Sequence, residues 1–144
     1  MENFDSDQDI HPSRYLDPKD PFYPCQSQPK FYKPICYFYA PIYYLDQSND
    51  DYLSALKWCQ SAEIKYVDAC TKGVGSRIMK YNIYDPKFAE SICLQTSVNQ
   101  IPYCIEGMLS YYVVNFNSVT KGKELCSLLQ TSNEKLCLNS LNKF

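Results

Sequence analysis

The sequence has few of the residues that catalysis and metal binding require. His11 is the single histidine in 144 residues, and no two of the eight cysteines have the close spacing of a zinc site. A Ser/His or Cys/His nucleophile pair would have to use His11, which lies in an acidic, proline-containing stretch. We therefore expect a protein that is not an enzyme, with no catalytic residue, no metal and no cofactor.

Charge and hydropathy argue against two further classes. The chain has 14 basic and 16 acidic residues and a formal charge of −2, so nothing indicates a nucleic-acid partner. No apolar run approaches the roughly 20 residues that cross a bilayer, so we expect no transmembrane segment in this chain. A hydrophobic content of 45% with only four glycines can support the core of one domain.

The eight cysteines form the dominant pattern of the sequence. They fall into four pairs, each enclosing ten residues, and the first members of successive pairs are 34, 34 and 33 residues apart. This period is typical of helical-hairpin repeats. Eight cysteines permit 105 pairings, and repeat symmetry selects the local one. The predicted disulfides are Cys25–Cys36, Cys59–Cys70, Cys93–Cys104 and Cys126–Cys137.

Four disulfides indicate an oxidising compartment, because the cytosol keeps thiols reduced. Residues 1–20 contain six acidic residues and no apolar segment of the kind that a secretory signal needs. We therefore expect a fragment of a secreted or extracytoplasmic protein whose signal or membrane anchor lies upstream. A thiol-rich intracellular protein is the alternative.

Composition divides the chain into two parts. Residues 1–24 are acidic and contain four prolines, which predicts a disordered leader or linker. Residues 25–144 are predicted to form an all-α domain, a short α-solenoid of about four 34-residue hairpins that each carry one disulfide. The first hairpin should be irregular, with a helix only from about Pro34 and a kink at Pro41. Terminal repeats often diverge in this way.

Cap residues and apolar spacing locate six further helices. Asp85 followed by Pro86 is the clearest start, Asn99 is the simplest cap before Pro102, and Thr131 with Glu134 is spaced as a capping box. The helices are expected at about 51–60, 63–79, 86–94, 99–116, 120–129 and 133–141. In the second of these, the expected core residues are Ile64, Val67, Ala69, Val74 and Ile78.

Small residues recur at fixed distances from the cysteines. Glycine inside a helix costs roughly 1 kcal/mol of propensity, so a close contact with a neighbouring hairpin is the expected compensation. Four residues before the first cysteine stand Ala55, Ala89 and Gly122, and three residues after the second stand Gly73, Gly107 and Ser140.

This pattern resembles the disulfide-stapled, tetratricopeptide-like hairpin repeats of secreted cysteine-rich bacterial proteins. The resemblance covers residues 25 to about 141 and is most complete in residues 55–73 and 89–107. It implies a curved helical scaffold that binds other proteins or cell-wall material and has no catalytic site.

A second resemblance is to the twin-cysteine proteins of the mitochondrial intermembrane space. In that class both cysteines of a motif share one helix and bridge to the other motif. Pro29, Pro34 and Pro102 interrupt the intervals that would have to be helical. An assembly subunit of this class is therefore the alternative function, and disulfides between intervals would favour it.

Tyrosine is abundant, with fourteen in the chain. Most should pack in the core, with Trp58 shielding a disulfide, and a surplus would form an exposed patch that binds a protein, peptide or glycan. The seventh and eighth positions after the second cysteine are equivalent in three units. The candidate binding residues at these positions are Tyr43, Tyr44, Arg77, Tyr111 and Tyr112. The competing interpretation is that all of them are buried between hairpins.

Overall fold

The computed structural model describes residues 22–144, and almost all of the predicted leader lies outside this range. Within it the chain is all-helical, with seven α-helices, two short 3-10 helices (η) and no strand. No helix in this part is long and apolar enough to span a membrane. The elements are η1 (Cys25–Ser27), α2 (Lys33–Gln47), α3 (Tyr52–Cys59), η2 (Ile64–Tyr66), α4 (Val67–Tyr81), α5 (Pro86–Cys93), α6 (Ile101–Phe116), α7 (Val119–Leu128) and α8 (Thr131–Leu141).

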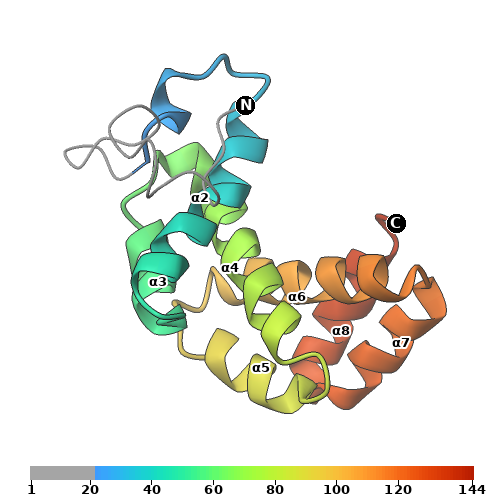
Figure 1. Ribbon diagram of the computed structural model, residues 1–144. Coiled ribbons are helices and arrows are strands. Elements are labelled where there is room, and N and C mark those ends of the chain that lie inside the picture. The colour runs from blue at the N-terminus through green and yellow to red at the C-terminus, as the bar shows by residue number, and fades with distance from the viewer. Residues whose placement is uncertain (1–21) are drawn as a thin grey trace.

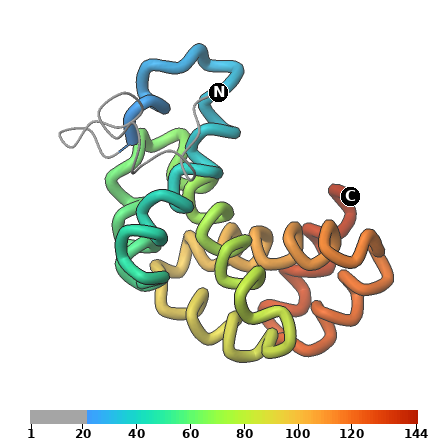
Figure 2. Tube along the Cα trace, in the orientation of Figure 1, coloured from blue at the N-terminus to red at the C-terminus, as the bar shows by residue number. Residues whose placement is uncertain are grey.

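The long helices α2, α4, α6 and α8 contact one another in that order. The contact of α4 with α6 is the most extensive, followed by that of α4 with α2. The short helices α3, α5 and α7 lie along the outer edge of the bend (Figure 1). The backbone trace in Figure 2 shows two arms that meet at an angle, with α4 at the corner.

Three of the short helices begin where the sequence predicts. Asp51, Asp85 and Ser118 stand at the N-caps of α3, α5 and α7. In each case the side-chain oxygen accepts a hydrogen bond from the N–H three residues later, at 3.1–3.2 Å. These bonds satisfy N–H groups that have no partner inside the helix.

Two helix starts differ from the prediction. Gln100, rather than Asn99, is the N-cap of α6, which leaves Pro102 in the first turn where no N–H is needed. Helix α8 begins at Thr131, so the capping box with Glu134 does not form, and the N–H of Glu134 bonds to the carbonyl of the N-cap residue, Gln130.

The prediction that Ile64 belongs to the core is wrong: its side chain is 91% exposed. Ile64 lies in the short 3-10 helix η2, which has three residues per turn. Its side chain therefore does not continue the buried face of the α-helix that follows. Val67, Val74 and Ile78 are buried as predicted, and Ala69 packs against the core from its edge.

Four disulfides join each short element to the long helix that follows it. They link η1 to α2, α3 to α4, α5 to α6 and α7 to α8, with Cα–Cα distances of 5.4–5.6 Å. Each bond joins the two ends of one interval, and all eight cysteines have no exposed surface. The four bonds fit an oxidising environment, whether extracytoplasmic or the mitochondrial intermembrane space.

Glycines bring the long helices into backbone contact. A Cβ atom on Gly73 of α4 would clash with the carbonyl oxygen of Phe38 in α2. A Cβ atom on Gly107 of α6 would clash in the same way with the carbonyl oxygen of Lys72 in α4. Phe38 and Lys72 both stand two residues after the second cysteine of their intervals, so the two contacts are equivalent. The close approach expected at these glycines is confirmed.

The folded region includes residues that precede Cys25. Phe22 is 1% exposed, and its ring stacks on Trp58 with centroids 4.1 Å apart. The ring of Phe22 also lies 5.5 Å from that of Tyr37 in α2. Trp58 stacks in turn on Tyr44, at 4.8 Å, so this row of rings ties the start of the folded region to α2 and α3.

A carboxylate from α5 caps the start of α8. Glu90 is 3% exposed, and its Oε2 accepts from the N–H of Gln130 at 3.0 Å and from Nδ2 of Asn133 at 2.6 Å. A negative charge is favourable there because the first N–H groups of a helix lack partners within it. Glu90 therefore ties the start of α8 to α5.

Replacing Glu90 by alanine should destabilise the protein by about 3 kcal/mol, because the buried amide of Asn133 and the N–H of Gln130 lose their acceptor. The measurement is denaturant unfolding followed by circular dichroism. Glu124→Ala is the matched control, since Glu124 is exposed and pairs with Lys121 of its own helix. The control should change the unfolding free energy by less than about 0.5 kcal/mol. A Glu90→Ala loss as small as this would contradict the capping role.

Candidate functional site

The tyrosines predicted to bind a partner are partly buried. Tyr44 stacks on Trp58, and the ring of Tyr112 lies 4.8 Å from that of Phe116. These contacts use much of each ring for internal packing. The tyrosines of the set that pack against the core are Tyr43, Tyr44, Tyr111 and Tyr112.

Arg77 holds the middle of the fold together. Its Nη2 donates to Oδ1 of Asp46 at the end of α2, at 2.7 Å, and its side chain is only 13% exposed. The Nε atom of Arg77 lies 4.0 Å from Oδ1 of Asp50, and its guanidinium lies 5.0 Å from the ring centre of Tyr81. The positive charge is thus largely matched by carboxylates at the end of α2 and in the loop that follows it.

The ionisation of two tyrosines near the long helices is suppressed. Burial raises the pKa of Tyr52 to about 12, with the Asp50 carboxylate raising it and Arg77 lowering it. The charge of Asp68 and its hydrogen bond raise the pKa of Tyr103. Both hydroxyls therefore stay protonated at neutral pH. Among residues 22–144 no three His, Cys, Asp or Glu side chains come together as metal ligands.

Arg77 and Tyr111 line one groove, which we call the three-helix groove. It has a volume of about 290 Å³ and crosses α2, α4 and α6. Tyr39 and Val114 on its walls are 43% and 71% exposed. The side chains that shape it are Tyr39 and Ile42 from α2, Arg77 and Lys80 from α4, and Tyr111 and Val114 from α6.

The three-helix groove presents the same face of successive helices. Arg77 and Tyr111 are equivalent in the repeat, as are Lys80 and Val114, one helical turn later. Gly73 lies between the walls, where the backbone of α2 leaves no room for a side chain. Sequence reasoning brought two of these residues together, and adding positions three residues further along the helix would have found the other two.

Tyr43, Tyr44 and Tyr112 are not among the residues that line this groove. The positions on α2 are instead Tyr39 and Ile42, which the sequence analysis did not select. Because α2 crosses α4 at Phe38 and Pro41, the part of α2 nearest the groove lies earlier in the helix than repeat symmetry suggests.

A second hollow, of about 550 Å³, adjoins the three-helix groove along α2 and α4. Phe38 and Tyr39 line both, and Ile35, which is 45% exposed, extends the apolar wall. Lys72 lines its other side and pairs with Glu106 at 3.2 Å. An apolar strip of α2 is therefore open to solvent along both hollows.

Comparisons with protein-family models, with curated proteins and with solved structures gave no significant match. Function therefore has to be inferred from the geometry of this chain.

Proposed function

We propose that the protein is a non-enzymatic extracytoplasmic binding module, built as a short α-solenoid of about four hairpins. The equivalent backbone contacts at Gly73 and Gly107 support a repeated unit, since each joins a long helix to the one before it. A stack of like hairpins creates an extended face to which successive units contribute equivalent residues.

The disulfides support the tetratricopeptide-like class over the alternative. Each bond lies within one interval, so each hairpin carries its own bridge. A twin-cysteine assembly subunit of the mitochondrial intermembrane space would need bonds between intervals. The four disulfide bonds fit the oxidising environment outside the cytosol, so secretion remains part of the proposal.

The three-helix groove is the observation that carries the binding role. Its exposed walls are aromatic and aliphatic, a surface that takes the apolar side chains of a protein segment. Lys80 is exposed, and no carboxylate of residues 22–144 forms an ion pair with it. Of the three partner classes that the sequence leaves open, a peptide segment with apolar side chains and one acidic group fits this surface best.

Peptides selected against the full chain from a displayed random library should bind the three-helix groove. The double variant Tyr39→Ala/Val114→Ala should weaken their binding at least about tenfold, because it removes exposed apolar contact area. Arg77 is left in place because its ion pairs hold α4 to α2. Affinities can be measured by isothermal titration calorimetry.

Tyr84→Ala is the matched control, since Tyr84 is 94% exposed and lies outside the groove. It should leave peptide affinity unchanged. Equal losses in both variants, or no loss in the double variant, would contradict the proposed groove. Circular dichroism shows whether each variant keeps its helical content.

A further inference from the structure

One face of α2 is apolar and is not covered by any helix of residues 22–144. Tyr39 stands three residues after the second cysteine of its interval, as Gly73 and Gly107 do in α4 and α6. At each of these glycines the preceding long helix packs against the backbone. No long helix precedes α2 in the described chain, so the side of α2 that carries Tyr39 stays open. The apolar residues of this open face are Ile35, Phe38, Tyr39 and Ile42.

The two ends of the row of long helices differ in polarity. In proteins built from stacked helical repeats, the terminal units need a polar outer face. At the α8 end, Asn139 and Asn142 are exposed at the positions equivalent to those by which α2 contacts α4. At the other end, α2 has two charged residues among fifteen, Lys33 and Asp46, and both already form ion pairs. The open face of α2 therefore needs a cover.

Free positive charge lies at both ends of the open face. Lys65 lines the second hollow, and Lys80 lines the three-helix groove. Both are exposed, and no carboxylate of residues 22–144 forms an ion pair with either. A second copy docked face to face would set lysines near lysines, and one docked head to tail would bury the amides of α8. The cover that fits is acidic as well as apolar.

The sequence that precedes the described range has this chemistry. Residues 1–10 contain four acidic residues and no lysine or arginine, whereas residues 11–21 contain two acidic and two basic residues. Phe4 and Ile10 are the two large apolar residues of the acidic half after Met1, and Asp5, Asp7 and Asp9 lie between them. Residues 4–10 thus combine apolar side chains with negative charge.

These residues are tethered close to the open face. Phe22 packs against Tyr37 of α2, with ring centres 5.5 Å apart. The chain between Ile10 and Phe22 can extend over up to about 40 Å, which exceeds the length of α2, about 22 Å for fifteen residues. A short tether gives an effective concentration in the millimolar range, so even a weak contact is populated.

We propose that residues 4–10 of the same chain dock on the open face of α2. Phe4 and Ile10 pack in the two hollows, and the aspartates between them face Lys65 and Lys80. Because Tyr39 lines both hollows, the docked segment competes with an external peptide for the three-helix groove. This competition rests on the proposed function, whereas the docking itself does not.

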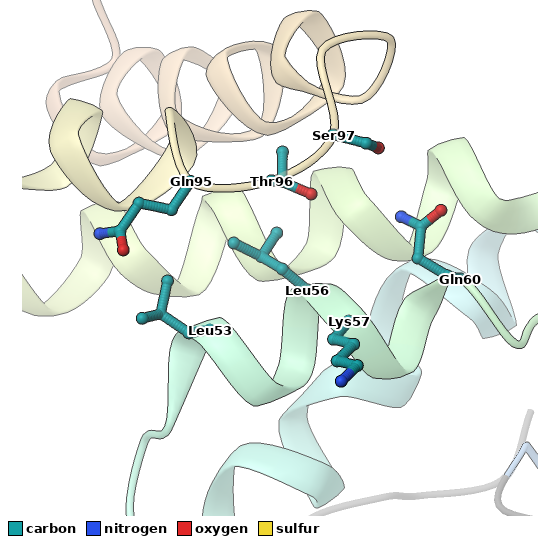
Figure 3. A pocket seen from close by; sticks show the side chains of 7 residues that line it. All are labelled: Leu53, Leu56, Lys57, Gln60, Gln95, Thr96 and Ser97. Atoms are coloured by element: carbon teal, nitrogen blue, oxygen red, sulfur yellow. The ribbon is translucent and has the colours of Figure 1, made fainter.

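A third hollow provides a comparison surface within the same molecule. It has a volume of about 330 Å³ and lies between α3 and the loop that joins α5 to α6 (Figure 3). In Figure 3 the side chain of Leu56 points toward this loop, with Gln60 on one side and Gln95 on the other. Leu53 and the exposed Lys57 also line it. An acidic segment that bound any apolar and basic hollow would bind here too.

The test compares methyl resonances of the full chain with those of a full-chain variant. Phe4→Ser/Ile10→Ser removes both apolar anchors, so the methyl resonances of Ile35 and Ile42 should shift by more than their linewidths. Leu16→Ser, in the half of the segment with balanced charge, is the matched control and should leave both resonances unchanged. In the unsubstituted chain about 0.5 M NaCl should shift them in the same direction as the double variant, because salt screens the contact with the lysines.

Three results would overturn the docking. The first is that the resonances of Ile35 and Ile42 do not change in the double variant. The second is an equal shift at Leu53, which lines the comparison hollow. The third is that the resonances depend on protein concentration, which would indicate that a second copy covers the face.

Peptide affinity tests the competition separately. A peptide selected for the three-helix groove should bind the Phe4→Ser/Ile10→Ser variant at least about threefold more tightly than the unsubstituted chain, because the tethered competitor is lost. Equal affinities would overturn the competition. If no selected peptide binds either protein, the proposed function fails, and the methyl resonances still decide whether residues 4–10 dock on α2.

Discussion

Complete reduction of the four disulfides should leave the protein largely unfolded at 25 °C. Each bond joins residues eleven positions apart, and a loop of this length contributes about 2 to 3 kcal/mol in the chain-entropy model. Together the four rival the net stability of a typical domain, which is about 5 to 15 kcal/mol. Thermal melting followed by circular dichroism, before and after reduction and alkylation, measures the effect.

The same experiment has a native-state control. All eight cysteines are paired in disulfides, so alkylation without reduction should find no thiol to modify. Reduction under native conditions should be slow because the reductant reaches a sulfur only after local opening. A fully reduced and alkylated protein that melts within a few degrees of the oxidised one would show that the bonds contribute little.

Gly107→Ala should destabilise the protein by about 3 kcal/mol, although alanine is the better helix former. The new Cβ atom would meet the carbonyl of Lys72 and lie 2.9 Å from the backbone nitrogen of Ser76. Backbone atoms of two packed helices cannot move aside cheaply, so α4 and α6 would have to separate. Chemical denaturation gives the change in unfolding free energy.

Gly122→Ala is the matched control for this substitution. There the new Cβ atom would meet the side-chain ends of Leu141 and Val113, at 2.7 and 2.8 Å. These ends can shift, and alanine gains about 1 kcal/mol of helix propensity, so the change should be close to neutral. Equal effects of the two substitutions would show that the contact at Gly107 is not tight.

The sequence predicted the parts of the fold that local chemistry determines. The spacing of the cysteines, the cap Asp85 before Pro86, and the glycines at helix contacts are each signals of local structure. Ile64 was misplaced because a 3-10 turn changes the helical phase, which apolar spacing alone does not reveal. The capping role of Glu90 has no local signal in the sequence, because its partners lie about 40 residues further along the chain.

The candidate site was harder to predict than the fold. Equivalent repeat positions identified Arg77 and Tyr111, but the crossing of α2 over α4 decides which residues of α2 reach the groove. That crossing depends on contact between backbone atoms of Phe38 and Gly73. The pattern of apolar side chains in the sequence does not predict where it occurs.

The backbone contacts at Gly73 and Gly107 also set a condition for the binding role that we propose. Flexible side chains between α2, α4 and α6 would let the helices adjust their separation, but direct glycine-to-carbonyl contact does not. The three-helix groove therefore has a fixed width before any partner arrives. Binding of the proposed peptide would then cost little ordering of the protein, and its selectivity would come from shape, because a segment too bulky for the groove could not open it.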